Sequence, residues 1–383
     1  MSAQKFVVKK KAKTGGKDSK GQPALGKLKP EKKPEVKEEV LPQLPPAKMN
    51  ICVFGAGATG GTIAAYLKSK MRNIFMVASG EERRLIRSNG LKVESPKGTT
   101  FIDLDTRETL NQKVDLVILT VSVDQIKEII HKNHNFLENT IILTTQDSIR
   151  AEKIISLILG EKNIVSSVVM FDAVCAEPNL INYRKEGKWY IGRPFSANDD
   201  KIKEIAEELS LAFEMVVVDD IMSVKWAKLF VNLYNCIPAL LGKNAQETFA
   251  DLDMAKLGIL LLKEGFQILE GAGIKLTNLP DFGLDKLRQL TQMSIEEAAQ
   301  SFSQEVSNLG KEQMHKVVSQ IINAGYSSQA DCINGELVIF SRFNNTGANL
   351  NAKAVNLMHR VEKLHKFLNI DELKREFDLN TIK

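Results

Sequence analysis

Apolar and polar positions follow two different periods along this chain. Between residues 49 and 218, short apolar runs that predict strands alternate with segments of helical periodicity. The run 114–121 is apolar almost throughout, as expected of a strand buried on both faces. The expected strands are 51–54, 74–78, 114–121, 140–145, 165–171, 188–192 and 215–218, and the expected helices include 62–67, 85–89, 124–132 and 200–213. This alternation predicts a doubly wound, parallel α/β sheet of the Rossmann type.

The pattern changes near Asp219. From Ile221 onward, apolar positions recur every three or four residues and no clear strand intervenes, so we expect an all-helical second domain. Loop signals inside it are Pro280–Gly283 and Asn344–Gly347. The predicted division is therefore an arm at 1–48, an α/β domain at 49–220 and a helical domain at 221–383, which would bind substrate or form a dimer interface.

The first expected strand leads into a glycine-rich turn, Gly55-Ala-Gly-Ala-Thr-Gly60, which is followed by a helix. In a dinucleotide-binding turn, Gly55 permits the tight bend, Gly57 lets a pyrophosphate approach the backbone, and Gly60 lets the helix pack on the strand. The helix N-terminus then offers N–H groups and a positive dipole end to the phosphates. The alternative is a glycine-rich turn with no ligand.

Charge is distributed unevenly along the chain. Residues 1–48 hold 13 lysines, five acids and six of the eleven prolines, which leaves the remaining residues with a net charge of −3. This arm lacks periodicity and bulky apolar residues, so we expect it to be disordered or extended. Its Lys9–Lys13 cluster could contact an acidic protein, acidic lipid or nucleic acid, and a solvated tail without a partner is the alternative.

The four cysteines lie far apart, without a Cys-x-x-Cys pair. They argue against a disulfide framework or a metal site and fit a reducing, intracellular compartment. No uninterrupted apolar run is long enough for a membrane span. We expect a cytoplasmic protein, with the mitochondrion as the alternative, because the arm has lysine where an import sequence would have arginine.

The end of the second expected strand indicates which nicotinamide cofactor would bind. An NAD site usually places an acid there to hold the ribose 2′-hydroxyl, but residues 62–80 contain no acid. Ser79, Arg83 and Arg84 follow instead, and a hydroxyl with two guanidinium groups suits a 2′-phosphate. The sequence therefore favours NADP(H), with solvated helix arginines as the alternative.

A second group of polar residues lies early in the helical region. Lys228, Asn232 and Asn235 have i, i+4 and i+7 spacing, which would place them on one helix face. A cation and two carboxamides beside a cofactor can polarise a carbonyl and hold a polar substrate. On spacing alone, a polar stripe between packed domains explains them at least as well.

Three motifs taken together resemble the ketopantoate reductases (2-dehydropantoate 2-reductases). They are the glycine turn Gly55–Gly61, the Lys225-Trp-x-Lys-Leu-x-x-Asn232 segment and Ile333-Asn-Gly335 in a late helix. The resemblance covers about residues 49–370. It implies a Rossmann domain followed by a helical domain of the 6-phosphogluconate dehydrogenase type, NADPH as the hydride donor and a 2-keto acid as the small carbonyl substrate. It also implies Lys228 as the general acid and Asn232 as a substrate ligand. The expected cofactor-binding residues are Gly55, Ala56, Gly57, Ala58, Thr59, Gly60, Ser79, Arg83, Arg84 and Gln146.

The chain departs from the family pattern at several positions near the substrate. Ser122 stands where the family usually has lysine, Asp147 where it has asparagine, and Gln329 where it has the catalytic glutamate. The arginine at the end of the second strand is Ser79, and the second helix asparagine is shifted to Asn235. Ser122, Asp147, Gln329 and Asn235 are nevertheless the expected substrate-binding positions. The lysine and asparagine replacements remove positive charge, so an altered and less anionic carbonyl is expected.

Two functions of different classes follow. The first is an NADPH-dependent reductase with Lys228 as proton donor. The second is a degenerate reductase fold that serves as a binding or structural subunit of a larger assembly through its basic arm. Homodimerisation is compatible with either.

Overall fold

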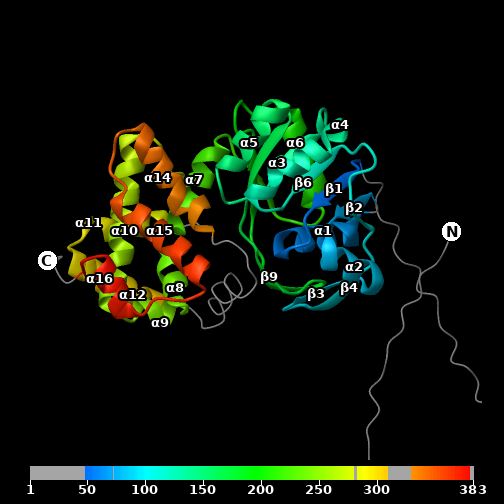
Figure 1. Ribbon diagram of the computed structural model, residues 1–383. Coiled ribbons are helices and arrows are strands. Elements are labelled where there is room, and N and C mark those ends of the chain that lie inside the picture. Colours follow the sequence, from blue (N-terminus) through cyan, green and yellow to red (C-terminus); the bar gives the residue numbers. More distant parts are fainter. Residues whose placement is uncertain (1–47, 72, 280–282, 309–328, 380–383) are drawn as a thin grey trace, which may run out of the picture. The chain divides into compact units, whose positions relative to one another are not determined.

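The fold contains an eight-stranded sheet, of which Figure 1 labels β1, β2 and β6. Neighbouring strands of this sheet are parallel except for β8 (Ile164–Val169) and β11 (Trp189–Gly192), which are antiparallel. The computed structural model describes residues 48–71, 73–279, 283–308 and 329–379. The strand order is β12-β11-β8-β7-β6-β1-β2-β5. The strands are β1 (Ile51–Phe54), β2 (Ile74–Val77), β5 (Thr106–Arg107), β6 (Leu116–Leu119), β7 (Ile141–Thr144), β8 (Ile164–Val169), β11 (Trp189–Gly192) and β12 (Met215–Val217). All seven expected strands are present, and β5 was not predicted.

Helices cover both faces of this sheet, because each central strand is apolar on both sides. Val53 packs in one core with Ile63 of α1, whereas its neighbour Phe54 packs in a second core with Ile126 of α3. The first core also includes residues of α2 and α6, and the second includes residues of α5. The helices are α1 (Ala58–Lys70), α2 (Gly80–Asn89), α3 (Val123–Lys132), α4 (His134–Leu137), α5 (Arg150–Leu159) and α6 (Asp200–Ser210). The predicted doubly wound arrangement is confirmed.

A four-stranded sheet, ordered β4-β3-β10-β9, was not predicted. Its strands are β3 (Leu91–Ser95), β4 (Gly98–Ile102), β9 (Asp172–Glu177) and β10 (Leu180–Lys185). In β3, Leu91 and Val93 are buried between more exposed neighbours, so the strand is amphipathic. The sheet braces α1, since a Cβ on Gly61 would lie 2.9 Å from the Cδ1 atom of Ile181 in β10.

After β12, every described element is a helix, as predicted. The α7 helix begins at Ile221, where the Asp220 side chain accepts a hydrogen bond from the Ser223 N–H. A large apolar core joins these helices and includes Phe230, Phe249 and Leu262, none of which is exposed. The helices are α7 (Ile221–Val231), η1 (Leu233–Asn235), α8 (Cys236–Leu241), α9 (Ala245–Phe249), α10 (Leu252–Gly271), α11 (Leu284–Gln292), α12 (Ile295–Asn308), η3 (Gln329–Cys332), α14 (Asn334–Phe343), α15 (Asn349–Leu364) and α16 (Ile370–Glu376).

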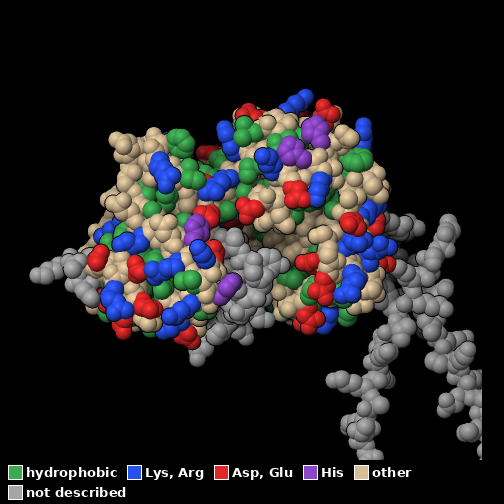
Figure 2. Space-filling model, in the orientation of Figure 1, with side chains coloured by type: hydrophobic (Ala, Val, Ile, Leu, Met, Phe, Trp, Pro, Cys, Tyr) green, Lys and Arg blue, Asp and Glu red, His purple; other side chains and the backbone are tan. Residues whose placement is uncertain are grey.

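Several expectations lie wholly or partly beyond the described residues. These are the arm, apart from Lys48, and most of the Pro280–Gly283 loop. Residues 44–383 group as one compact unit, and the division into domains at residue 220 stays a prediction. Within the described ranges, no helix is both long enough and apolar enough to cross a bilayer. Acidic and basic side chains are interspersed on the face drawn in Figure 2, in keeping with the small net charge outside the arm.

Candidate cofactor and active site

The glycine turn between β1 and α1 has the geometry that its sequence predicts. Gly55 has a φ of +108°, in the range that favours glycine. A Cβ on Gly60 would lie 2.1 Å from the carbonyl oxygen of Gly55 and 2.3 Å from the Thr120 Oγ1 atom, so only glycine lets α1 approach so closely. A Cβ on Gly57 would meet nothing within 4 Å, and Gly57 is exposed. The turn therefore combines one closely packed glycine with one that faces open space.

The start of α1 is suited to a phosphate group. Gly57 is its N-cap and supplies no side chain to the first-turn N–H groups, and that turn contains no acid. Ala58 and Thr59 are only partly buried there. Open space beside uncapped N–H groups fits the pyrophosphate of a dinucleotide, with Gly55–Gly60 as its cradle.

Polar side chains connect the carboxyl ends of the neighbouring strands. The Thr120 hydroxyl, just after β6, donates to the carbonyl oxygen of Phe54 at 2.7 Å. The Gln146 amide, just after β7, donates to the carbonyl oxygens of Leu119 and Val121, both at 2.8 Å. The Oε1 atom of Gln146 is buried and has no partner among the described residues. Gln146 thus holds together the segments after β6 and β7, at the sheet edge where ligands of open α/β sheets bind. Its Oε1 atom remains as an acceptor without a partner among the described residues.

The three residues expected to select the cofactor lie at the start of α2. Ser79 is its exposed N-cap. Arg83 forms an ion pair with Glu108 at 3.1 Å, and Arg84 forms one with Glu81 at 3.5 Å. Both guanidinium groups therefore already contact a carboxylate, which the sequence pattern did not indicate.

The proposed catalytic residues lie near the end of α7. Lys228 is partly buried, and the structure shows no partner for its ammonium group among the described residues. The Asn232 amide donates to the Lys228 carbonyl at 2.9 Å, and the Asn235 amide donates to the Asn232 Oδ1 atom at 2.9 Å. The expected continuous α-helix through Asn235 is wrong, because α7 ends at Val231 and Asn235 belongs to η1. Pro238 explains this break, since its ring clashes with the carbonyl group four residues earlier and it has no N–H.

The three substituted family positions lie on different elements. Ser122 is the exposed N-cap of α3, where its hydroxyl contacts the Gln125 Oε1 atom at 3.1 Å. Asp147 is partly buried directly after Gln146. Gln329 begins η3, and its side chain lies outside what the structure describes. No described contact joins Lys228 to Ser122 or Asp147.

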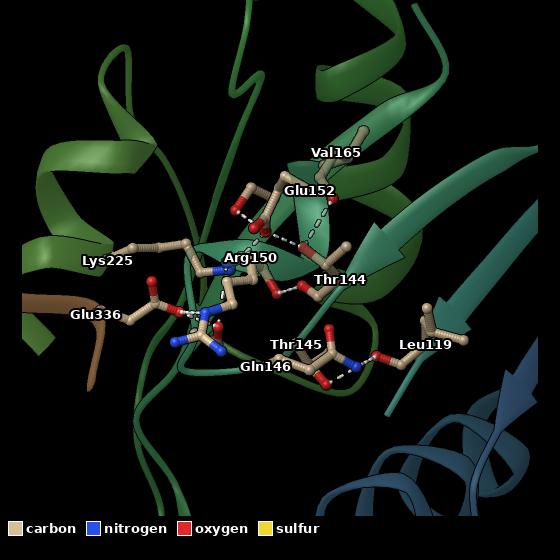
Figure 3. A network of polar contacts seen from close by, with 12 residues as sticks. Leu119, Thr144, Thr145, Gln146, Arg150, Glu152, Val165, Lys225 and Glu336 are labelled. Atoms are coloured by element: carbon tan, nitrogen blue, oxygen red, sulfur yellow. Dashed lines mark hydrogen bonds and ion pairs between the residues drawn. The ribbon is translucent and has the colours of Figure 1, made fainter. Parts of the chain in front are cut away.

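A buried ion pair that we did not predict joins α7 to α5 (Figure 3). Lys225 of α7 and Glu152 of α5 are 0% and 1% exposed, and the Lys225 Nζ atom lies 2.5 Å from Glu152 Oε1. The Thr144 and Ser166 hydroxyls donate to the same oxygen at 2.5 and 2.7 Å. Burial alone would raise the pKa of Glu152, but the Lys225 charge and these hydrogen bonds outweigh burial and lower that pKa. Glu152 is therefore ionised and tightly held.

A second ion pair connects the start of α5 to α14. The Arg150 Nε atom lies 2.8 Å from Glu336 Oε1, and the Ser148 hydroxyl donates to that oxygen at 2.9 Å. Arg150 also donates to the carbonyl oxygen of Asp331 at 2.7 Å. Burial raises the pKa of Glu336, and the charge of Arg150 only partly offsets this effect. Figure 3 shows both ion pairs around the end of β7.

The sequence holds a signal for one residue of each ion pair. Lys225 interrupts the apolar start of α7, and Glu336 follows the Ile333-Asn-Gly motif directly. Charged residues in such positions are seldom fully buried without a partner, so each called for an opposite charge elsewhere. Which residue supplies that charge depends on the tertiary fold.

Fold and turn together define a class of protein. A doubly wound sheet that carries this glycine turn and is followed by a helical region is the architecture of nicotinamide-dependent oxidoreductases. Among solved structures, D-mandelate dehydrogenase in a ternary complex with NADH and anilino(oxo)acetate superposes with a TM-score of 0.69 at 19% identity, covering 82% of this chain and 98% of that chain. A PanE/ApbA family ketopantoate reductase from Ralstonia eutropha also has a TM-score of 0.69, at 17% identity and with the same coverage of both chains.

The sequence comparisons then indicate the family. Residues 51–194 match the family described as ketopantoate reductase PanE/ApbA. The 2-dehydropantoate 2-reductase of Mesorhizobium japonicum is 26% identical over 253 residues, which are 59% of this chain and 78% of that protein. That of Halobacterium salinarum is 22% identical over 243 residues, 60% of this chain and 78% of that protein. The resemblance indicated by the motifs is confirmed: this chain is similar in sequence to the ketopantoate reductases, and the comparisons support an oxidoreductase.

Proposed function

We propose that this protein reduces a 2-keto acid or a related carbonyl compound with NADPH. The observation that carries the proposal is the glycine turn, in which Gly60 packs against backbone and Gly57 faces open space at the start of α1. That combination suits a bound pyrophosphate. NADPH, when bound, supplies a hydride to the carbonyl carbon.

Lys228 is the proposed proton donor. Reduction of a carbonyl to an alcohol consumes one proton at the oxygen, and a partly buried ammonium group that has no other partner among the described residues can deliver it. The Asn235 amide bonds to Asn232 Oδ1, which leaves part of each carboxamide available to orient the substrate. Gln329 cannot exchange a proton with Lys228 as a glutamate would, so Lys228 exchanges its proton with solvent.

The substrate proposed is less anionic than the one its relatives' name implies. Asp147 is partly buried in the segment after β7, and Ser122 supplies no charge. At an effective dielectric constant of about 20, a like-charge contact near 4 Å costs on the order of 4 kcal/mol. An ionised Asp147 in contact with a substrate carboxylate would therefore weaken binding roughly a thousand-fold.

Cofactor titration of the purified protein tests the proposal. NADPH should bind more tightly than NADH by fluorescence or calorimetry. Gly57→Ala tests this directly, because its Cβ would meet no atom of the described residues within 4 Å and Gly57 has a φ of −65°, which alanine adopts without strain. It should keep the unfolding midpoint of the wild type and lose cofactor affinity. A folded protein that binds neither cofactor would contradict the proposal and favour a binding or structural subunit.

Replacing Lys228 tests the chemical step. Lys228→Met should lower the turnover of any accepted carbonyl by roughly 10² or more, the usual range for loss of a general acid. Cofactor affinity should stay unchanged, which separates this effect from a loss of binding. Turnover within a few-fold of wild type would show that another group donates the proton.

A further inference from the structure

The end of β2 lacks the acidic residue that NAD sites usually have, but Glu108, directly after the neighbouring strand β5, brings a carboxylate to the same place. In the parallel register of β2 and β5, Val77 lies opposite Arg107, and the Ala78 N–H donates to the Arg107 carbonyl at 3.0 Å. Glu108 follows Arg107 directly, so it lies level with the last residues before α2. A carboxylate thus reaches the place where Rossmann folds read the ribose 2′-position, although residues 62–80 contain none.

Glu108 is held there by one of the two arginines expected to bind a 2′-phosphate. The Arg83 Nη2 atom lies 3.1 Å from Glu108 Oε2, with the Arg83 side chain 29% and the Glu108 side chain 68% exposed. The Nε atom of Arg83 is buried and lacks a hydrogen-bond partner in the described part of the chain. The guanidinium group therefore has donors to spare, but a 2′-phosphate can approach it only in the presence of the Glu108 carboxylate.

We propose that Glu108 sets the cofactor selectivity of this protein by competing with the 2′-phosphate for Arg83. The inference rests on the proposed function, because it assumes that a nicotinamide dinucleotide binds along the glycine turn. Glu108 lowers affinity for the phosphorylated ribose and leaves affinity for the unphosphorylated ribose nearly unchanged. The ratio of the affinity for NADPH to the affinity for NADH is therefore smaller than Ser79, Arg83 and Arg84 would give without Glu108.

The experiment measures binding and needs no substrate. The affinities of 2′,5′-ADP and 5′-AMP are determined by calorimetry for the wild type, for Glu108→Gln and for Glu204→Gln. Glu204 is a matched control, since it is an exposed carboxylate that pairs with Lys201 on α6, outside the proposed cofactor site. Glu108→Gln should bind 2′,5′-ADP about five-fold more tightly, the upper range for releasing an exposed ion pair. The affinity of Glu108→Gln for 5′-AMP, and both affinities of Glu204→Gln, should change less than two-fold.

A variant of Arg83, the other member of the ion pair, shows whether Arg83 mediates the gain in affinity for 2′,5′-ADP. In an Arg83→Gln background, adding Glu108→Gln should no longer raise the affinity for 2′,5′-ADP. An unchanged affinity for 2′,5′-ADP in Glu108→Gln, an equal gain in Glu204→Gln, or a gain that persists without Arg83 would each overturn this inference while leaving the proposed function intact. If no nucleotide bound to the wild type or to any variant, the proposed function and this inference would fall together.

Discussion

Replacing Lys225 by methionine should destabilise the fold strongly, by an amount that depends on pH. Methionine has similar length and keeps the apolar contacts, but it leaves the Glu152 carboxylate buried without its counter-ion. Only the Thr144 and Ser166 hydroxyls would then contact the charged oxygen. The other carboxylate oxygen, Oε2, is already buried and has no partner in the described residues.

The loss can be estimated from the proton that the carboxylate would take up. At pH 7, protonating a carboxyl group whose ordinary pKa is 4.5 costs about 3.4 kcal/mol. At pH 5 the same step costs about 0.7 kcal/mol. The first value lies at the lower end of the roughly 3–5 kcal/mol lost when one partner of a buried ion pair is removed. Lys225→Met should thus lose about 3–4 kcal/mol of unfolding free energy at pH 7 and about 1 kcal/mol at pH 5.

Urea unfolding, followed by the fluorescence of Trp189 and Trp226, measures this loss at both pH values. The double variant Lys225→Met/Glu152→Gln carries no charge at either position of this pair, so it should recover part of the stability at pH 7, and its loss relative to wild type should depend little on pH. Lys201→Met removes a lysine from an exposed pair and should leave the midpoint unchanged. A loss below 1 kcal/mol at pH 7, or an equal loss at both pH values, would refute the reasoning.

Three further predictions concern other parts of the site. Gly60→Ala should lower the unfolding free energy by about 1–3 kcal/mol, since its Cβ would lie 2.1 Å from a backbone oxygen, and a variant as stable as wild type would contradict this packing. Because burial raises the pKa of Glu336 in the folded protein, loss of its proton above the ordinary pKa favours the unfolded chain, and the fold loses stability as pH rises. The stability of wild type relative to Glu336→Gln should therefore fall from pH 4.5 to pH 7 in urea titrations, and a constant or rising difference would be inconsistent with that shift. The double variant Ser122→Lys/Asp147→Asn should raise kcat/KM for a 2-keto acid by at least ten-fold. If kcat/KM did not rise while cofactor binding stayed intact, the substrate would not contact residues 122 and 147.

The central sheet could be predicted because its strands are nearly continuous apolar runs. Strands buried on both faces, such as 116–119, carry this signal in their own sequence. The small sheet could not be predicted in the same way. Its strands are short and amphipathic, and β3 pairs with β10, so Val93 finds its partner Ile181 far along the chain. Such pairing depends on tertiary contacts more than on local preference.

The sequence predicted the glycine turn of the candidate site better than it predicted the buried ion pairs. The glycine turn has fixed spacing, and each glycine has a local geometric reason, so the backbone geometry of the turn could be predicted from the sequence, whereas its role in cofactor binding stays a prediction. The ion pairs depend on residues that are distant in sequence, such as Glu152 and Lys225, which are 73 positions apart. The end of α7 lies between these cases. A helix face was a reasonable prediction for Lys228 and Asn232, but it overlooked the effect of Pro238 on the residues before it.

The charges around the end of β7 strengthen the argument for a weakly anionic substrate. The sequence alone shows a lost lysine at Ser122 and a gained carboxylate at Asp147, and Arg150 could have restored the missing positive charge. In the structure, however, Arg150 pairs with Glu336, just as Lys225 pairs with Glu152. Each cation of the network is neutralised by its own carboxylate, so neither leaves net positive charge to attract a substrate carboxylate. Lys228 is then the cation available to a ligand among these residues. When it contacts the carbonyl oxygen that receives its proton, neither Arg150 nor Lys225 is left unpaired to bind a substrate carboxylate.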